Sequence, residues 1–149
     1  MAIEWPSAPT STDMYVGIPD NWPAAPAGPP NILVSSIPCT VNVTIDVGVH
    51  GMTLGGSFQV RAFAESIGPG QELLLGTTTV AIVPGQTTPY TAAINVPGNT
   101  LWGEGRIDPA TGTPVSGVYK IVAVMQHMNP GPTFVSGFVE DTLKMFLSP

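Results

Sequence analysis

The stretch Thr40-Val41-Asn42-Val43-Thr44-Ile45-Asp46-Val47-Gly48-Val49 decides the fold class. Its odd-numbered positions are all branched aliphatic residues, and its even-numbered positions are polar or glycine. Successive side chains of a β-strand point to opposite faces of the sheet. The alternation therefore predicts a strand with one buried face and one exposed face.

Similar runs, rich in β-branched and aromatic residues, lie on both sides of this stretch. Their lengths and alternation predict strands over residues 32–37, 57–65, 72–83, 88–96, 118–128 and 134–147. We expect Gly76 to mark a bend or bulge, and we expect the run 118–128 to be a central strand because it is the most apolar. The chain is therefore predicted to be all-β, an antiparallel β-sandwich.

Four Pro-Gly pairs separate these runs, at residues 69–70, 84–85, 97–98 and 130–131. Proline presets φ for the second position of a type I or type II turn. Glycine then accepts the positive φ that a type II turn needs at the next position. Each pair is therefore predicted to be a tight turn between neighbouring strands.

The sequence Gly117-Val118-Tyr119-Lys120-Ile121-Val122-Ala123-Val124 resembles the penultimate strand of immunoglobulin-like and fibronectin-type domains, in which a tyrosine opens a core strand. The resemblance implies an immunoglobulin-like β-sandwich over residues 31–149. The cysteine pair and the core tryptophan of antibody domains are absent, and we expect the one cysteine, Cys39, to be a small buried side chain. Because such folds have many functions, the resemblance implies none in particular.

Residues 1–30 differ from the rest of the chain. They contain seven prolines, which remove backbone hydrogen-bond donors and favour an extended arm. This Pro-rich N-terminal arm carries Trp5, Tyr15 and Trp22. We interpret these three aromatic residues as interface anchors, which pack either on the chain's own sandwich or on a neighbouring subunit.

The charge of the chain excludes several classes of partner. Only 9% of its 149 residues are charged, and the net charge is −6 with four basic residues. Four scattered cations do not form a phosphate-binding patch, so nucleic acid is not expected as a partner, and anionic membranes are disfavoured. We expect no membrane insertion, because no run of 18 apolar residues is present. We also expect no signal peptide, which leaves a cytoplasmic, virion or processed extracellular location open.

The sequence contains no familiar catalytic motif. One set of side chains suits a metal, namely His50, Met52, Met125, His127 and Met128, because thioether sulfur and imidazole are ligands that copper accepts. Methionine also fills gaps in cores, and solitary histidines are commonly structural. We therefore expect no cofactor, with copper as the alternative.

Residues 98–115 form the longest predicted loop and carry Trp102, Glu104, Arg106 and Asp108. Long ordered loops in compact domains often have a function. These side chains suit a sugar, a partner protein or an enzyme site. The simpler interpretation is an Arg106 ion pair that stiffens the loop.

The function that these observations favour is a non-enzymatic structural or interaction module that self-assembles or decorates a larger assembly. A virion or tail decoration protein, or a filament or shell subunit, fits this description. A surface so poor in charge needs to be covered by other chains, so we expect a homo-oligomer, with other structural proteins as further partners. Two alternatives remain open, a β-sandwich that binds a small ligand or copper and an enzyme that uses the loop 98–115.

Overall fold

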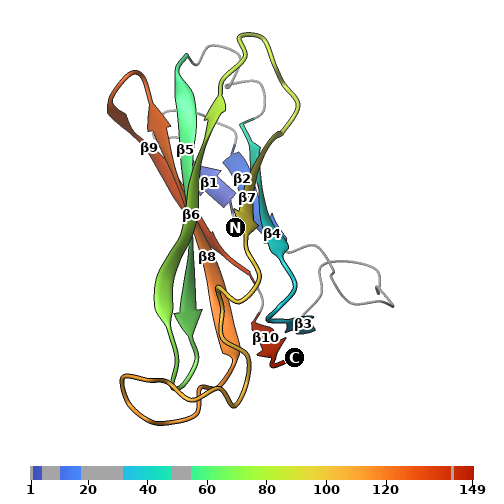
Figure 1. Cartoon of the computed structure of the whole chain (residues 1–149). Helices are drawn as coiled ribbons and strands as arrows, with labels where there is room; N and C mark the ends of the chain where they lie inside the picture. Colours follow the sequence, from blue (N-terminus) through green and yellow to red (C-terminus); the bar gives the residue numbers. More distant parts are fainter. Residues whose placement is uncertain (1, 5–10, 18–31, 48–54, 142) are drawn as a thin grey trace.

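The structure, a computed structural model, describes residues 2–4, 11–17, 32–47, 55–141 and 143–149. Over these residues the chain is all-β, with two sheets and no helix, as the sequence predicts (Figure 1). The described part of the chain accordingly offers no helix with the length and apolar character of a membrane span.

The first sheet has four antiparallel strands around the stretch that decides the fold class. Its order is β1 (Ala2–Glu4), β2 (Ser11–Gly17), β4 (Cys39–Asp46) and β7 (Tyr90–Val96). The alternation predicted for β4 is confirmed, because Val41, Val43 and Ile45 are fully buried while the side chains between them are partly exposed.

The second sheet is built around β8 (Val118–Met128), which confirms the prediction that this strand is central. On one side of β8 lie β5 (Ser57–Ser66) and then β6 (Glu72–Ala81). On the other side lie β9 (Pro132–Glu140) and β10 (Lys144–Leu147), and β10 also pairs in parallel with β3 (Ile32–Val34).

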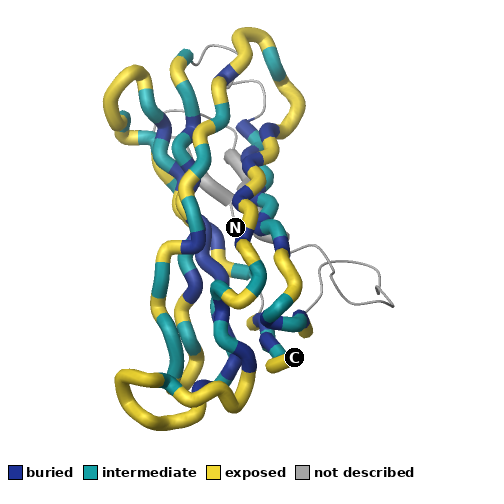
Figure 2. The backbone as a smooth tube through the Cα atoms, in the orientation of Figure 1, coloured by how far each residue is buried: buried dark blue, intermediate teal, exposed yellow. Residues whose placement is uncertain are grey.

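The two sheets share one hydrophobic core, an arrangement compatible with a β-sandwich. The Phe58 ring of β5 meets the Tyr90 ring of β7 edge to face, with 5.7 Å between ring centroids. Buried positions alternate with exposed ones along the strands (Figure 2). Strands β4, β5 and β7 therefore turn one face to the core and leave the other outside.

The irregularity predicted at Gly76 is confirmed. The register between β5 and β6 shifts between Ala62 and Phe63, opposite this glycine. A Cβ atom on Gly76 would lie 2.6 Å from Cγ2 of Ile94 in β7. Glycine thus lets the edge of one sheet approach the other.

The predicted long final strand, residues 134–147, is interrupted. From Glu140 to Lys144 the chain takes four residues to pass three residues of β8, Val122 to Tyr119. This extra residue is a bulge that divides the strand into β9 and β10 on the same edge of β8. The side chain of Lys144 is fully buried, and its Nζ lies 3.3 Å from Oδ2 of Asp141.

Three other predicted strands are shorter than expected, and the one predicted over 72–83 ends at Ala81. The strand predicted over 32–37 ends at Val34, because the Ile37 N–H donates to the Val34 carbonyl and closes a turn. The strand predicted over 88–96 begins at Tyr90. Pro89 precedes it and has no N–H to offer to a neighbouring strand.

The predicted turn geometry holds at one of the four Pro-Gly pairs. Gly85 has a φ of 84°, and the N–H of Gln86 donates to the Val83 carbonyl across 3.1 Å. At residues 97–98 the positive φ falls on Asn99 instead, and Gly98 is required because the Ser36 carbonyl leaves no room for a Cβ atom. The glycines of the pairs 69–70 and 130–131 do not have a positive φ.

Part of the predicted N-terminal arm belongs to the first sheet. Strand β2 pairs with β4, and β1 pairs with β2. The backbone of Tyr15 lies opposite Thr44. The proposed anchors Trp5 and Trp22 lie outside the described residues.

Candidate interaction surface

The long loop brings together two of the side chains that the sequence singled out. The guanidinium carbon of Arg106 lies 4.6 Å from the ring centroid of Trp102, which is a cation–π contact. The ion pair expected for Arg106 is not found among the described residues. The aromatic face, rather than an acid, holds this guanidinium.

The two acids of the loop do not form a pair. Oδ1 of Asp108 accepts a hydrogen bond from the Ala110 N–H across 2.8 Å, which closes a local turn. Glu104 is exposed, and its backbone N–H donates to the Phe146 carbonyl across 2.7 Å. Asp108 therefore serves the local turn, and the backbone of Glu104 attaches the loop to β10.

Tyr119, at the start of β8, holds the Trp102 end of the same loop through a hydrogen bond. Its side chain is fully buried, and its hydroxyl donates to the Trp102 carbonyl across 3.0 Å. Burial raises the pKa of Tyr119, and this is partly offset by the hydrogen bond with Trp102 and the positive charge of Arg106. The residue at the centre of the sequence resemblance thus ties the loop to the core.

Of the proposed copper ligands the structure describes Met125, His127 and Met128, and it does not bring these three together. Nε2 of His127 donates to the Gly55 carbonyl across 2.7 Å, and Nδ1 lies 2.9 Å from Oγ1 of Thr133. Both imidazole nitrogens are therefore engaged within the chain. Met125 is fully buried in the core, while Met128, one position beyond His127, faces the opposite side of the sheet.

The remaining two proposed ligands, His50 and Met52, lie outside the described residues. Among residues 32–47, 55–141 and 143–149, no group of three or more His, Cys, Asp or Glu side chains is placed to hold a metal ion. Cys39 is buried as predicted, and burial raises the pKa of its thiol from 9.0 to about 11.

A different feature stands out on the solvent-facing side of β5, β6, β8 and β9, which we call the outer face. Large apolar side chains are neighbours across all four strands. Phe63 lies opposite both Leu74 and Val122, and Val124 lies opposite Phe138. We define the outer apolar patch as Phe63, Leu74, Val122, Val124, Phe134 and Phe138.

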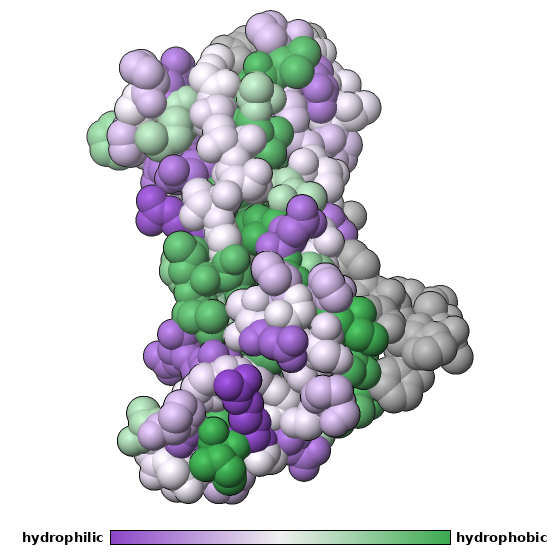
Figure 3. Space-filling model, viewed as in Figure 1, coloured by the Kyte–Doolittle hydropathy of each residue, from purple (hydrophilic) through white to green (hydrophobic). Residues whose placement is uncertain are grey.

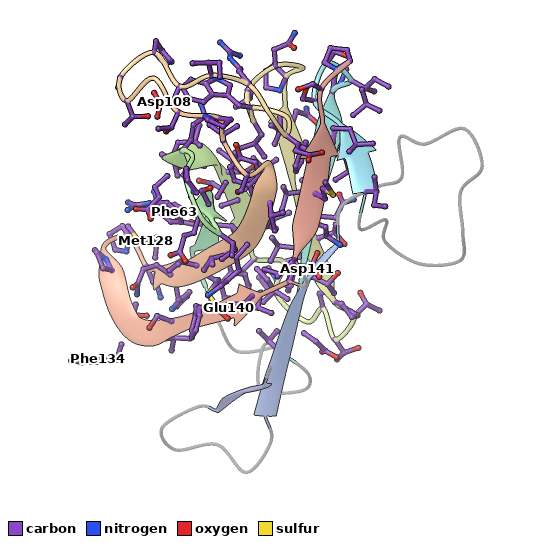
Figure 4. All side chains as sticks on the ribbon, turned by 90° about the horizontal axis from the view of Figure 1, so that it is seen from below. Phe63, Asp108, Met128, Phe134, Glu140 and Asp141 are labelled. Carbon is purple, nitrogen blue, oxygen red and sulfur yellow. The ribbon has the colours of Figure 1, made fainter. Side chains whose placement is uncertain are left out.

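Several members of the outer apolar patch are strongly exposed. Leu74 is 50% exposed, Phe138 is 43% exposed and Phe134 is 99% exposed. Figure 3 shows hydrophobic surface over the lower half of β6, and Figure 4 shows Phe134 at the margin of the molecule, beyond the strands. Large exposed apolar side chains gathered on one face of a sheet are typical of interaction sites in soluble proteins.

Charged side chains border the outer apolar patch at one end. Nζ of Lys120 lies 3.8 Å from a carboxylate oxygen of Glu65 and 3.5 Å from one of Glu140. Lys120 lies opposite Glu65 and diagonally across from Glu140, so the three residues form an ion-pair cluster across three strands. An apolar centre with a polar border is typical of protein interfaces.

At the other end of the outer face is a shallow hollow of about 420 Å³. It is lined by Gln59, Arg61, Val124, Gln126, Met128 and Pro132. The amide nitrogen of Gln126 donates to the backbone carbonyls of Thr133 and Val135, across 2.6 and 3.1 Å. The floor of the hollow is therefore held in place by the β8–β9 hairpin.

The sequence reasoning did not identify this surface, although a signal was present. Val122 and Val124 make β8 apolar on its outward positions as well as its inward ones. The same pattern also predicts a central strand, which is the prediction made above. In a sandwich one face of each sheet covers the core, so a strand that is apolar on both faces also predicts a second covered face.

Comparisons with known proteins give no family. No family model matches the chain, and no match is found among curated proteins. One similar solved structure is described as a beta-glucosidase from Listeria innocua in complex with glucose, with 12% sequence identity and a TM-score of 0.44. The match covers 93% of this chain and 17% of that chain. A likeness at this level carries no argument about activity.

Proposed function

We propose that this protein is a non-enzymatic structural module that assembles with copies of itself, or with subunits of a larger assembly, through the outer face. A virion or tail decoration protein and a filament or shell subunit both fit such a module. The observation that carries the proposal is the outer apolar patch, in which Phe134 is 99% exposed and Phe138, at 43% exposure, lies opposite Val124. In a chain with 9% charged residues, such a patch needs a covering partner.

We further propose that the fold is an immunoglobulin-like sandwich. The strand order supports this in two ways. The order β6-β5-β8-β9 corresponds to the C′-C-F-G sheet of variable-type domains, and the order β2-β4-β7 corresponds to strands A, B and E. In addition, Tyr119 at the start of β8 donates to the backbone of the preceding loop. The module would then present its C′-C-F-G sheet to the partner.

The test is the mass of the full-length chain in solution across a range of concentrations, by sedimentation or light scattering. We expect self-association that is weakened by Phe134→Ser and Phe138→Ser. A matched control is Ile107→Ser, because Ile107 is 55% exposed but lies in the long loop at the opposite end of the sheet from the β8–β9 hairpin (Figure 1). A full-length chain that is monomeric at all concentrations contradicts self-assembly.

A further inference from the structure

The four basic residues of the chain are held in different ways. Three of them contact an acid or an aromatic ring in the structure, namely Lys120 with two glutamates, Lys144 with Asp141, and Arg106 on the ring of Trp102. Arg61 is exposed, and its guanidinium donates to the neutral Oε1 of Gln59 across 3.2 Å. Within the described residues no acidic side chain contacts Arg61. This cation is therefore available to a carboxylate from outside.

The position of Arg61 joins charge to apolar surface. It lines the hollow of about 420 Å³ and lies opposite Val124, which in turn lies opposite Phe138. The three residues thus form one row across β5, β8 and β9. A ligand that fits this row carries a carboxylate at one end and a large apolar group next to it.

The first 31 residues of the chain have the complementary chemistry. They contain three acids and no basic residue. Two of the acids, Glu4 and Asp13, lie in β1 and β2, whose backbones are paired within the first sheet. The third, Asp20, lies in the segment 18–31, which also contains Trp22 and five prolines. Proline-rich segments commonly bind to aromatic-lined surfaces, because their extended form loses little entropy on binding.

We propose that the outer face binds the segment 18–31 of a second copy of this chain, with the carboxylate of Asp20 on Arg61 and the ring of Trp22 on Val124 and Phe138. This proposal rests on the proposed function and names the occupant of its interface. Charge-assisted pairing of arginine with a carboxylate gives direction to the contact, and the tryptophan supplies apolar area.

The spacing of the two groups is about 3 Å shorter than the row on the sheet, a difference that long side chains can span. In an extended chain, residues i and i+2 face the same side and lie about 6.6 Å apart. Arg61 and Phe138 flank one intervening strand, so their backbones lie about 9.6 Å apart, two strand spacings. The long side chains of arginine and tryptophan cover the difference. Asn21, between Asp20 and Trp22, then faces away from the sheet.

A charge exchange between copies tests the proposal. In full-length chains, Arg61→Glu and Asp20→Arg are each expected to raise the self-association constant Kd by at least about tenfold, because each variant places like charges together. An equimolar mixture of the two variants is expected to associate like the unchanged chain. In that mixture the introduced glutamate of one copy meets the introduced arginine of the other, and Asp20 of the first meets Arg61 of the second.

The matched controls are Arg106→Glu and Glu104→Arg, which make the same changes of charge in the long loop, away from the row, and are expected to leave Kd within about twofold. Arg61→Gln removes the charge without reversing it and is expected to weaken association by a smaller factor. Circular dichroism of each variant confirms that the strands are intact.

The outcomes separate this inference from the proposed function. A monomeric full-length chain overturns both. Self-association that Arg61→Glu weakens no more than Arg106→Glu overturns the assigned occupant and leaves the assembly function standing. Restoration in a single chain that carries both exchanges, without restoration in the mixture, shows that the segment binds its own chain and overturns the role of the second copy.

Discussion

The two faces of the sheet formed by β5 and β8 differ in two respects. They differ in how far their apolar side chains are buried, and in the partners that their polar side chains have within the chain. On the inner face, Phe58, Tyr119 and Met125 are fully buried, and the polar atoms of Tyr119 and His127 have partners within the chain. On the outer face, Val124 is 37% exposed, and the partner of Arg61 among the described residues is the neutral side chain of Gln59. The inner face secures the fold, and we propose that the outer face binds another molecule.

The difference between the inner and outer faces is tested most strongly by replacing one phenylalanine on each face with alanine. Phe58→Ala is expected to lower the free energy of unfolding by about 3–5 kcal/mol, because it opens a cavity in the core. Phe138→Ala removes the same ring from the outer face and is expected to lower it by about 1 kcal/mol or less at low protein concentration. Denaturant unfolding of both variants measures the difference. Equal losses would show that the outer face also holds the fold together.

A smaller effect is expected from the hydroxyl of Tyr119. Tyr119→Phe keeps the ring in the core but leaves the Trp102 carbonyl without this donor. We expect a loss of about 1–3 kcal/mol in the free energy of unfolding. An unchanged free energy of unfolding would mean that the long loop is held by its backbone contacts with β10 instead.

The smallest effect concerns Cys39 and pH. Its pKa is raised from 9.0 to about 11, so the folded protein keeps the neutral thiol where the unfolded chain begins to ionise. The stability from this group is complete below pH 9 and is lost as the pH rises toward 11. Because the thiolate is the reactive form, alkylation at pH 8 is expected to be about 100-fold slower in the folded protein than in the unfolded control. Equal rates would contradict the burial of Cys39.

The inner face could be predicted from the sequence better than the outer one. Alternation located β4 and β5, and the apolar run located β8 as a central strand, because burial against a core imposes a period of two. The split between β9 and β10 could not be predicted from the sequence, because one extra residue shifts the pairing with β8 but leaves the pattern of apolar residues unchanged. Strand β2 could not be predicted, because it lies between Pro9 and Pro19 in a segment whose many prolines favour an extended arm.

The site residues show the same limit. Trp102 and Arg106 were predicted as candidate site residues, and they do contact each other. This could be predicted because an aromatic and a charged residue lie four positions apart in one loop. Arg61 and Phe138 were passed over, because only the pairing of β5, β8 and β9 brings them into one row. Residues on separate strands reveal a surface only once the register is known.

Hydroxyl-radical footprinting of the unchanged full-length chain at low and high protein concentration tests the central claim most directly. If the outer face binds other copies, oxidation of Phe134 and Phe138 falls as the concentration rises, while oxidation of Ile107 in the long loop stays constant. These side chains are 99%, 43% and 55% exposed in the single chain, so each starts from a measurable rate. Equal oxidation of the two phenylalanines at both concentrations would contradict the account.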